Sequence, residues 1–479
     1  MVPLDEAIGH VLTRCEPLVP VAVPAPSAAG LVLAADVVAA EAVPPFANTA
    51  MDGYAVRAAD TAGAPVILPV VAEVAAGHPA DRALQPGQAM RIFTGAPIPD
   101  GADAVVMVER TERLDDGLAV RIDVAVDPGS HLRAVGEDLK PGDRVLEAGD
   151  EVTPARLGVL ASLGVDEVLA HPRPRVGVLS TGDELVSGPA PLRPGQIRDS
   201  NRPTLLALVA EAGFEPVDLG RAADDEGAIT AAIERGAAAC DAVLSSGGVS
   251  MGDVDLVKVV LDRMGDMRWM QVAIRPAKPL AFGVVPGPGG ARVPVFGLPG
   301  NPVSSMVSFA LFARPGLRRL AGHADGRLHL PRLAAVAAEP LGRRPDGKTY
   351  FVRVVAGVDA GAGGVLRVRS SGGQGSHQLG AMARADGHLH LPRLAATAAE
   401  PLGRRPDGKT HFVRVVAQVD AGAGGALRVR SSGGQGSHQL GAMARADGLA
   451  VLPDGDGVAA GGAVEVMLLS EPPTLPATA

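Results

Sequence analysis

The stretch that decides the fold is DAVLSSGGVSMGDVDLVKVVLDRMG, residues 241–265, which joins two patterns of different period. Residues 241–246 form a short apolar run that ends in two serines, as expected of a buried strand. Two glycines follow, and residues 252–265 then carry apolar side chains at helical spacing. The stretch therefore predicts a strand, a glycine-rich loop and a helix in succession.

The same alternation of strand and helix continues before this stretch. The further strand and helix patterns lie at residues 175–180, 201–213, 215–220 and 224–237. In the first of these helices, Asn201 is the predicted N-cap and Pro203 lies in the first turn. Parallel strands need crossover connections, which the helices supply. We therefore predict a mostly parallel α/β domain over residues 173–322.

The N-terminal half consists mainly of short β runs separated by Gly and Pro. The clearest runs are PVILPVVAEV, AMRIF, DAVVMVE and LAVRIDV, which begin at residues 65, 89, 103 and 118. Closely spaced strands with turn residues between them predict compact β-rich domains. The first residues differ, because Leu4, Ile8, Val11 and Cys15 at helical spacing predict an amphipathic helix and not a signal peptide.

The C-terminal third contains an internal repeat. Residues 326–386 recur as residues 387–447 with five differences, Arg327/His388, Val336/Thr397, Tyr350/His411, Gly357/Gln418 and Val365/Ala426. Copies this similar indicate either a recent tandem duplication of 61 residues or an assembly artefact in the sequence. Each copy has strand patterns at FVRVVA and LRVRSS, but only the second continues into LAVLPDGDGVAAGGAVEVMLL, which adds two strands. We predict that residues 387–469 close a small β-barrel, whereas the first copy keeps an exposed strand edge and acts as a spacer.

Composition excludes several classes of protein. The 479 residues carry a net charge of −9 with only 3% aromatic residues, which argues against a general nucleic-acid binder. Cys15 and Cys240 form no CxxC motif, so a disulfide framework or thiolate zinc site is not expected, and a reducing cytoplasm fits. No uninterrupted apolar run approaches the ~20 residues that cross a bilayer. We expect a cytoplasmic protein with neither nucleic acid nor membrane as a partner.

The loop after the deciding strand has the residue types of a phosphate site. Gly247 and Gly248 let backbone N–H groups approach a phosphate, and the following helix points its positive end there. Helix capping explains Asp253 better than ligand binding does. Asp255 is better explained as a ligand of a magnesium ion that neutralises a nucleotide phosphate.

Three further motifs add to this site. STGDEL places Asp183 and Glu184 just beyond the first strand of the α/β domain, at the expected ligand edge. GLPGNPVSS opens a helix with exposed backbone N–H groups, and IRPAKP places Arg275 and Lys278 on a proline-stiffened turn suited to a tetrahedral oxyanion. Each motif alone is also explained by a turn, a fixed helix start or solvated side chains.

Taken in chain order, the motifs closely resemble those of the molybdopterin molybdenumtransferase family, which comprises the bacterial MoeA proteins and the E-domains of gephyrin and its plant counterpart. The motifs are NTAMDGYAV, TGAPIPDGADAVV, GEDL, STGDEL, SSGGVSMGDVD, IRPAKP, GLPGNPVSS and QGSH. The resemblance spans residues 4–469 and is interrupted by the extra copy.

The resemblance implies the last step of molybdenum cofactor biosynthesis. In that reaction molybdenum from molybdate enters adenylated molybdopterin, AMP leaves, and Mg²⁺ is required. The resemblance also implies an elongated homodimer whose active site lies between the α/β domain of one subunit and the β-rich domain of the other. An upstream adenylyltransferase and recipient molybdoenzymes are the further partners that it suggests.

The fold implied is multidomain α/β plus β, with a central, mostly parallel α/β domain of the molybdopterin-binding type, N-terminal β-rich domains and a small C-terminal β-barrel. The expected bounds are 1–45 with 140–172 for a discontinuous N-terminal domain, 46–139 for a β-rich domain, 173–322 for the α/β domain, 323–386 for the incomplete copy, 387–470 for the barrel and 471–479 for a disordered tail.

Carried over residue by residue, the family's functional positions form three sets. The catalytic acids fall on Asp52, Asp138, Glu184, Asp255 and Asp225, with Asp224 as the alternative to Asp225. The substrate-binding positions fall on Thr94, Arg133, Ser246, Gly247, Gly248, Ser250, Arg275, Lys278, Pro279, Pro299, Gly300, Asn301, Pro302, Arg414 and Ser437. The metal positions are Asp183, Glu184 and Asp255.

Two choices stay open at this stage. Arg353 and Ser376 are the first-copy counterparts of Arg414 and Ser437, and we favour the second copy because it completes its barrel. The alternative functions are a molybdopterin adenylyltransferase, which shares the α/β fold, and a non-catalytic scaffold or store for molybdate or cofactor. The sequence departs from residues common in the family at Ala47, Ala134 and Arg275.

Overall fold

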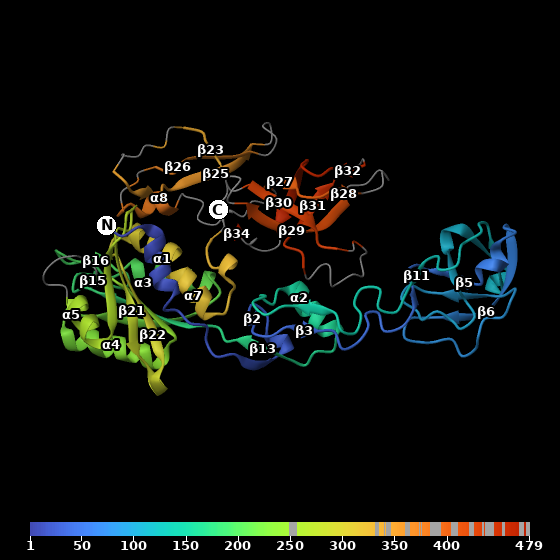
Figure 1. Cartoon of the computed structure of the whole chain (residues 1–479), viewed down its shortest axis with the longest axis horizontal. Coiled ribbons are helices and arrows are strands. Elements are labelled where there is room, and N and C mark those ends of the chain that lie inside the picture. Colours follow the sequence, from blue (N-terminus) through green and yellow to red (C-terminus); the bar gives the residue numbers. More distant parts are fainter. Residues whose placement is uncertain are drawn as a thin grey trace.

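Four packed units and the first copy of the repeat make up the chain in the computed structural model (Figure 1). The structure describes residues 1–248, 256–330, 335–339, 341, 346–359, 365–372, 374, 376–383, 394–403, 411–420, 426–433, 435, 445–452, 456–468 and 474–475. Within these residues, no helix is long and apolar enough to cross a bilayer.

The α/β domain is built on a six-stranded sheet of order β17-β14-β18-β22-β21-β19. Its strands are β14 (Arg175–Thr181), β17 (Glu215–Ala222), β18 (Ala242–Ser246), β19 (Asp266–Gln271), β21 (Pro279–Pro286) and β22 (Arg292–Leu298). β17, β14, β18 and β22 are parallel, whereas β21 and β19 continue the sheet antiparallel. All five residues of β18 are buried, as in a strand covered on both faces. The predicted mostly parallel sheet is confirmed.

Helices cover both faces of this sheet. They are α1 (Leu4–Leu12), α3 (Asn201–Glu211), α4 (Glu226–Ala239), α5 (Leu256–Met264), α6 (Pro302–Ser308), the π-helical turn η6 (Phe309–Ala313) and α7 (Arg314–Leu320). Leu244 of β18 belongs to the core formed with α1, α3 and α7, and its neighbour Val243 belongs to the core formed with α4 and α5. Alternate side chains of one strand thus fill the two opposite layers.

The N-terminal half forms two smaller units. The first combines β1 (Val21–Pro24), β2 (Val32–Leu33), β3 (Val37–Val38), β12 (Arg144–Leu146), α2 (Pro154–Ser162) and β13 (Glu167–His171). The second contains β4 (Asn48–Thr49), β5 (Gly53–Val56), β6 (Val66–Val74), β7 (Ala89–Ile92), β8 (Ala104–Met107), β9 (Thr111–Leu114), β10 (Ala119–Ile122) and β11 (Leu132–Arg133). Figure 1 shows this β-rich unit at the end of the molecule remote from the α/β domain.

Short elements complete these regions. They are the 3₁₀ turns η1 (Ala25–Ser27), η2 (Ala58–Thr61), η3 (Val108–Arg110), η4 (Asp115–Gly117), η5 (Pro288–Gly290) and η7 (Asp325–Arg327), and the strands β15 (Leu185–Val186), β16 (Ile197–Arg198) and β20 (Ile274–Arg275). β15 and β16 pair in parallel, and β20 lies outside the main sheet.

The second copy closes the predicted barrel. Its elements are β27 (Leu394–Ala398), β28 (Leu402–Gly403), β29 (His411–Asp420) and β30 (Ala426–Ser431), and the strands after the copy are β31 (Gly448–Leu452), β32 (Gly457–Val458), β33 (Ala463–Leu468) and β34 (Thr474–Leu475). β30, β27, β33, β31 and β29 follow one another, and β29 pairs back onto β30. The predicted small barrel is confirmed.

The first copy is not a separate spacer between domains, because it packs on the α/β domain. Its elements are β23 (Val336–Ala337), β24 (Thr349–Tyr350), β25 (Val354–Asp359), β26 (Val365–Ser370) and α8 (Leu379–Ala383). β23, β26 and β25 form a three-stranded sheet, while β24 pairs in parallel with β20 of the α/β domain. Phe351 packs on the apolar core of that domain. The spacer expectation is corrected because this copy makes its own contacts with the α/β domain.

Two smaller expectations also change. The N-cap of α3 is Ser200, and Asn201 is the first helical residue, which frees the Asn201 side chain for contacts outside the helix. In the expected tail, Thr474–Leu475 pair with Val419–Asp420 of β29, and the other residues of 471–479 lie outside the described part.

Candidate active site

Two glycine-rich turns lie side by side where the parallel strands of the sheet end. Gly247 and Gly248, after β18, have φ values of +101° and +67°, which favour glycine. A Cβ on Gly247 would lie 2.9 Å from the Thr181 carbonyl oxygen, and a Cβ on Gly300 would lie 3.8 Å from the Gly247 Cα. The carboxyl edge of the sheet, where ligands of this fold class bind, therefore presents unshielded backbone.

Acidic loops follow β14 and β17 at the same edge. The Asp183 N–H donates to Asp224 Oδ2 at 3.3 Å, and the Asp224 N–H donates to Asp183 Oδ1 at 3.3 Å. Glu184 lies in the first of these loops, with its carboxylate folded over Gly182. The two loops are thus joined through their own acids.

Asp224 and Asp225 have different roles in the second loop. Asp225 is the N-cap of α4, and its Oδ1 accepts from the Ala228 N–H at 2.9 Å. Asp224 is the neighbour that contacts the Asp183 loop. Of the two candidates for the same functional position, the structure places Asp224, and not Asp225, with the acids of the first loop.

Oxygen donors at this edge are of the kind that Mg²⁺ prefers. Mg²⁺ is commonly held by one or two carboxylates together with substrate phosphates and water. Asp183, Glu184 and Asp224 can supply those carboxylates. Among the described residues, no three His, Cys, Asp or Glu side chains form a ready-made metal cage. The donor set fits a cation shared with a phosphate ligand.

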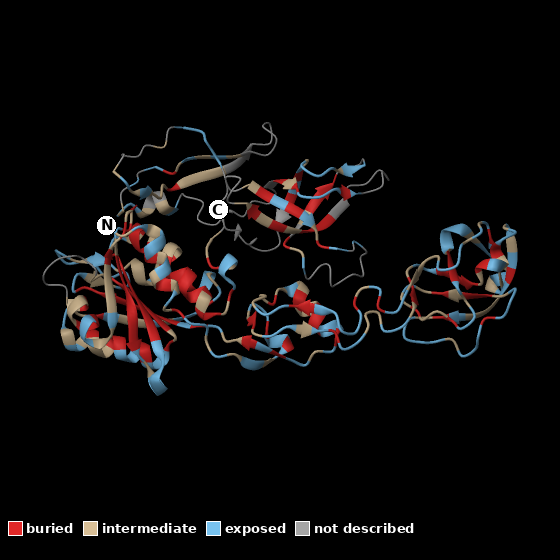
Figure 2. Cartoon of the chain, viewed as in Figure 1, coloured by how far each residue is buried: buried red, intermediate tan, exposed pale blue. Residues whose placement is uncertain are grey.

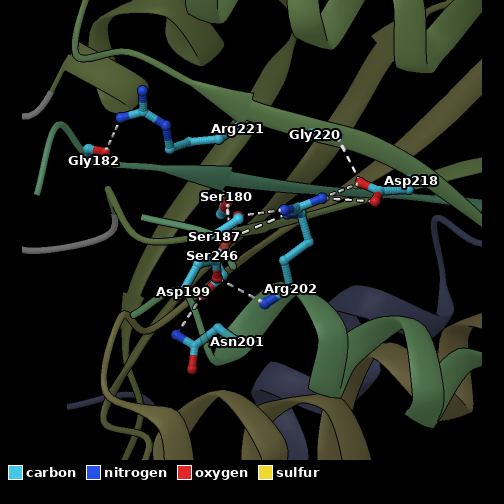
Figure 3. Close-up of polar contacts among 10 residues, drawn as sticks. All are labelled: Ser180, Gly182, Ser187, Asp199, Asn201, Arg202, Asp218, Gly220, Arg221 and Ser246. Carbon is cyan, nitrogen blue, oxygen red and sulfur yellow. Dashed lines mark hydrogen bonds and ion pairs between the residues drawn. The ribbon is translucent and has the colours of Figure 1, made fainter. Parts of the chain in front are cut away.

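A buried ionic network supports the first acidic loop (Figure 3). Asp199, with 1% of its side chain exposed, accepts from Ser180 Oγ at 2.7 Å and from Arg202 Nε at 3.1 Å. Arg202 also donates to both carboxylate oxygens of Asp218, at 2.7 and 2.6 Å, and to Ser187 Oγ at 2.9 Å. The network joins β14, β17 and the segment that precedes α3, so the loop has a fixed base.

The same network alters the acidity of Asp218. Burial raises the pKa of this carboxyl, but hydrogen bonds from Arg202 and from the Gly220 N–H outweigh burial and lower the pKa below its usual value. Arg221, on the same strand, donates to the Gly182 carbonyl at 2.9 Å. β17 therefore holds the Gly182 turn directly as well as through Arg202.

Asn201 connects the two glycine-rich turns. Its Nδ2 donates to Ser246 Oγ and to the Gly300 carbonyl, each at 2.7 Å. Ser246 ends β18, and Gly300 follows β22, so one amide bridges the ends of two neighbouring strands. Figure 3 shows Asn201 beside Ser246. This bridge keeps the adjoining backbone N–H groups in fixed positions.

The predicted basic pair borders the first copy. Arg275 ends β20, its guanidinium lies 5.8 Å from the centre of the Tyr350 ring, and its carbonyl accepts from the Phe351 N–H at 2.8 Å. Lys278 is exposed, and the half-buried Pro279 begins β21. At the start of α6, the Val303 N–H donates to the Ser376 carbonyl at 3.0 Å. The first copy thus spans from β20 to α6.

The two repeat arginines have matching local contacts but different neighbours. The N–H of Arg353 donates to Gln374 at 2.9 Å, and the N–H of Arg414 donates to Gln435 at 2.8 Å. Burial lowers the pKa of both guanidiniums, and for Arg414 the nearby carboxylate of Asp138 opposes that effect. Arg353 belongs to the copy that docks on the α/β domain, whereas Arg414 lies near Asp138, in the loop after β11.

Asp52 and Thr94 form a pair in the β-rich unit. Asp52 Oδ1 accepts from the N–H and from the hydroxyl of Thr94, both at 2.7 Å. These two bonds, the backbone one first, lower the pKa of the Asp52 carboxyl. Arg133 lies in β11 of this unit, opposite Asn48 of β4. Within one chain, these residues are remote from the glycine-rich turns (Figure 1).

The remaining predicted residues are placed as follows. Pro299 is buried at the end of β22, Asn301 is the exposed N-cap of α6, and Pro302 is its first residue. Asp138 lies in the loop after β11, and its N–H donates to the Val43 carbonyl at 3.0 Å. Ser250, Asp253, Asp255 and Ser437 lie outside the described residues.

Sequence reasoning missed the supporting residues Asp199, Arg202, Asp218 and Tyr350, and it saw only a capping role for Asn201. An arginine one turn from an aspartate was the available signal for Arg202 and Asp199, but such pairs are common on helix surfaces. No local signal could have linked Tyr350 to Arg275, because the two lie far apart in the sequence.

Comparisons with known proteins match three regions of the chain. Residues 2–164 match the MoeA N-terminal region (domain I and II), residues 177–319 the probable molybdopterin binding domain, and residues 395–469 the MoeA C-terminal region (domain IV). Molybdopterin molybdenumtransferase 2 of Mycobacterium tuberculosis is 44% identical over 398 residues, which are 81% of this chain and 94% of the relative.

Two further comparisons extend the same result. The molybdopterin molybdenumtransferase of Haemophilus influenzae is 38% identical over 75% of this chain and 86% of its own. The crystal structure of a molybdopterin biosynthesis MoeA protein from Pyrococcus horikoshii has a TM-score of 0.57 and 27% identity, and covers 98% of this chain and 99% of its own. The three domain matches in chain order and the shared length together show that this chain belongs to the MoeA family of molybdopterin molybdenumtransferases.

Proposed function

We propose that the chain is a transferase that inserts molybdenum from molybdate into adenylated molybdopterin and releases AMP, with Mg²⁺ required. One observation carries the proposal. In a chain of the MoeA family, bare glycine turns, paired acidic loops and a basic pair all border the carboxyl edge of one α/β sheet.

The glycine turns suit the phosphates of the adenylated substrate. The Gly247 N–H donates to the Leu298 carbonyl at 3.2 Å, so Gly247 contributes the open turn. Gly248 and Gly300 present backbone N–H groups without a Cβ in the way, and such groups bind phosphate oxygens well. The Asn201 bridge holds Ser246 and Gly300, and therefore both turns, at fixed separation. Preorganised donors of this kind orient a substrate without reorganising at the moment of reaction.

The acidic loops suit a cation that lies over those phosphates. Asp183, Glu184 and Asp224 would hold Mg²⁺, with Asp255 expected to join them. When bound, Mg²⁺ neutralises phosphate charge and makes AMP a better leaving group. The chain's own contribution is orientation, because the Asp199–Arg202 network keeps the Asp183 loop in place.

The basic pair suits molybdate. Arg275 offers a planar fork of N–H donors, and Lys278 offers a compact point charge, so together they can bind a tetrahedral dianion. The first copy lies against this pair through Tyr350. We therefore assign the C-terminal contribution to Arg353 and Ser376 of the first copy, in place of Arg414 and Ser437.

We also propose that the chain acts as a homodimer with shared active sites. Asp52 and Thr94 are organised like site residues, but they lie in the β-rich unit, remote from the α/β edge of their own chain (Figure 1). A second subunit can bring its β-rich unit to that edge.

The near-identity of the C-terminal copies supports a recent tandem duplication in this chain.

Release of AMP from adenylated molybdopterin, with molybdate and Mg²⁺ supplied, tests the function. Asp224→Ala is expected to reduce the rate at least ten-fold without changing thermal stability. Asp225→Ala is the matched control, because it removes a helix cap and should cost about 1 kcal/mol of stability with little effect on the rate. Absence of AMP release by the folded parent chain would refute the proposal.

A further inference from the structure

The first copy presents an apolar sheet face that its near-identical partner keeps buried. We define the first-copy face by Ala335, Ala337, Val352, Val354, Ala356, Leu366 and Val368, all of them exposed or half-buried. Their counterparts Ala396, Ala398, Val413, Val415, Ala417, Leu427 and Val429 are all buried. Figure 2 shows the contrast between the tan and blue sheet and the red barrel interior.

The hairpin β31–β33 covers the face in the second copy. β31 pairs antiparallel with β29, and β33 pairs antiparallel with β27. Ala450, Leu452, Val464 and Val466 of the hairpin are buried in the same core as the second-copy face. The structure thus contains the element that fits such a face, and the sequence contains it only once.

The first copy already has the local form that receives this hairpin. β23 pairs with β26 in the register that β27 has with β30, and β25 pairs with β26 in the register that β29 has with β30. The Ser371 N–H donates to the Arg353 carbonyl at 3.1 Å, as Ser432 does to Arg414 at 3.0 Å. The face is therefore formed before any cover is added.

The first copy contacts the α/β domain through one edge of its strand and leaves the other edge for the hairpin. In the second copy the Val415 carbonyl points toward β31, because it accepts from the N–H of Asp447, the residue before β31, whereas the Arg414 carbonyl points the other way, to Ser432. In the first copy the Phe351 N–H contacts β20, and Phe351 lies two residues from Arg353, so both point to the same edge, away from the hairpin side. The edge that includes Val354, the counterpart of Val415, is the one that would accept the hairpin.

One sequence difference between the copies favours the first one at a hairpin contact. Thr397 lies opposite Ala463, and its first-copy counterpart is Val336. At this place the first copy is more apolar, which favours cross-strand packing.

We propose that the first-copy face is a docking surface for the chain's own β31–β33 hairpin, Gly448–Leu468, which exchanges between the two copies. Pairings lost on one copy are regained on the other, which lowers the free-energy cost of exchange. The copies are joined in one chain, and this raises the effective concentration of the hairpin. When the hairpin docks on the first copy, the complete barrel lies against β20 and α6.

Disulfide trapping tests the proposal in the full-length chain. The Ala398 N–H donates to the Gly462 carbonyl at 2.9 Å, so the neighbouring pair, Thr397 and Ala463, is a non-hydrogen-bonded pair. The Cα atoms of such a pair lie close together, which suits a disulfide. V336C/A463C reports docking on the first copy, and T397C/A463C reports the hairpin in its observed place. I67C/A463C is the background control, because Ile67 is exposed on β6 of the remote β-rich unit. Burial raises the pKa of the native thiols, that of Cys15 to about 12, so they react slowly.

Mild oxidation followed by peptide mapping gives the result. We expect an intrachain disulfide in V336C/A463C at a yield at least ten-fold above that of I67C/A463C. A yield at background overturns the proposal while T397C/A463C still shows a folded barrel. A disulfide between two chains also overturns it, because the face would then belong to a second copy of the chain.

Discussion

The two C-terminal copies share almost all of their sequence, yet the same side chains are buried in one and half-exposed in the other. Val415 is 0% exposed inside the barrel, whereas Val354 remains half-buried. Their local hydrogen bonds match, since Ser370 and Ser431 each donate to a glutamate, at 2.7 and 2.8 Å. Local sequence therefore determines the strands and turns of each copy, but the elements packed against it determine its burial.

The two copies also differ in what their contacts provide: a closed core in the second copy and a position on the α/β domain in the first. The second copy has the closing hairpin and gains a closed core. The first copy has Tyr350 against Arg275 and gains a position on the α/β domain. A unit present twice can thus divide two tasks that a single unit would have to perform together.

The largest difference in stability between the copies is expected when a charge is introduced at equivalent positions of the two sheets. Val415→Asp places a carboxylate in the barrel core and should destabilise the barrel by at least about 3 kcal/mol, since an unpaired buried charge is costly. Val354→Asp should cost less than about 1 kcal/mol, because solvent reaches that site. Hydrogen exchange of β29 and β25 under increasing urea separates the two units, and equal losses would mean that both faces are covered.

Removal of the repeat arginines tests which copy serves the reaction. Arg353→Ala should lower kcat/KM for AMP release at least ten-fold, a loss of about 1.4 kcal/mol in transition-state binding. Arg414→Ala should change it less than two-fold, because Arg414 faces Asp138 of the N-terminal unit. The reverse order would return the assignment to the second copy.

The sequence was sufficient to predict the α/β domain and the barrel. Residues 241–265 have a strand period followed by a helical period, and β18 and α5 occupy that stretch. The two additional strands after residue 447 implied closure of the second copy, and β31 and β33 provide it. Hydrophobic period is a property of consecutive residues, so these features could be predicted without tertiary information.

The site could be predicted only in part. Gly247 and Asp183 were identified because both follow predicted parallel strands, whose carboxyl ends meet at the edge where ligands of this fold class bind. Asp224 and Asp225 could not be separated, because adjacent aspartates differ only in which one caps the helix. The bridge from Asn201 to Gly300 and the contact of Tyr350 with Arg275 depend on residues far apart in sequence, so no local pattern predicts them.

A smaller effect is expected when the first copy receives the second copy's residue at its contact with the α/β domain. Tyr350→His gives the first copy the residue of the second and should weaken docking by less than about 1 kcal/mol, the range of an exposed cation–π contact. Docking of this variant should be weaker at pH 5.5 than at pH 7.5. A histidine with an ordinary pKa of about 6.5 is neutral at the higher pH, and at the lower pH its positive charge repels Arg275.

Amide exchange at Thr349–Phe351 measures this docking. Tyr350→Phe is the control, because it keeps the aromatic ring but has no group that titrates between these pH values. A pH dependence equal in both variants would assign the effect to other groups.

The smallest difference is expected where both copies have the same local hydrogen bond. Glu339→Gln and Glu400→Gln each replace a carboxylate acceptor of a backbone N–H by a neutral one, and each should cost about 0.5–1 kcal/mol. Because the two acceptors are exposed and their geometry matches, the two losses should agree within about 0.5 kcal/mol, as measured by amide exchange at Ser370 and Ser431. A clearly larger loss in the second copy would show that closure of the barrel strengthens even this local bond, and that burial and local structure are not independent.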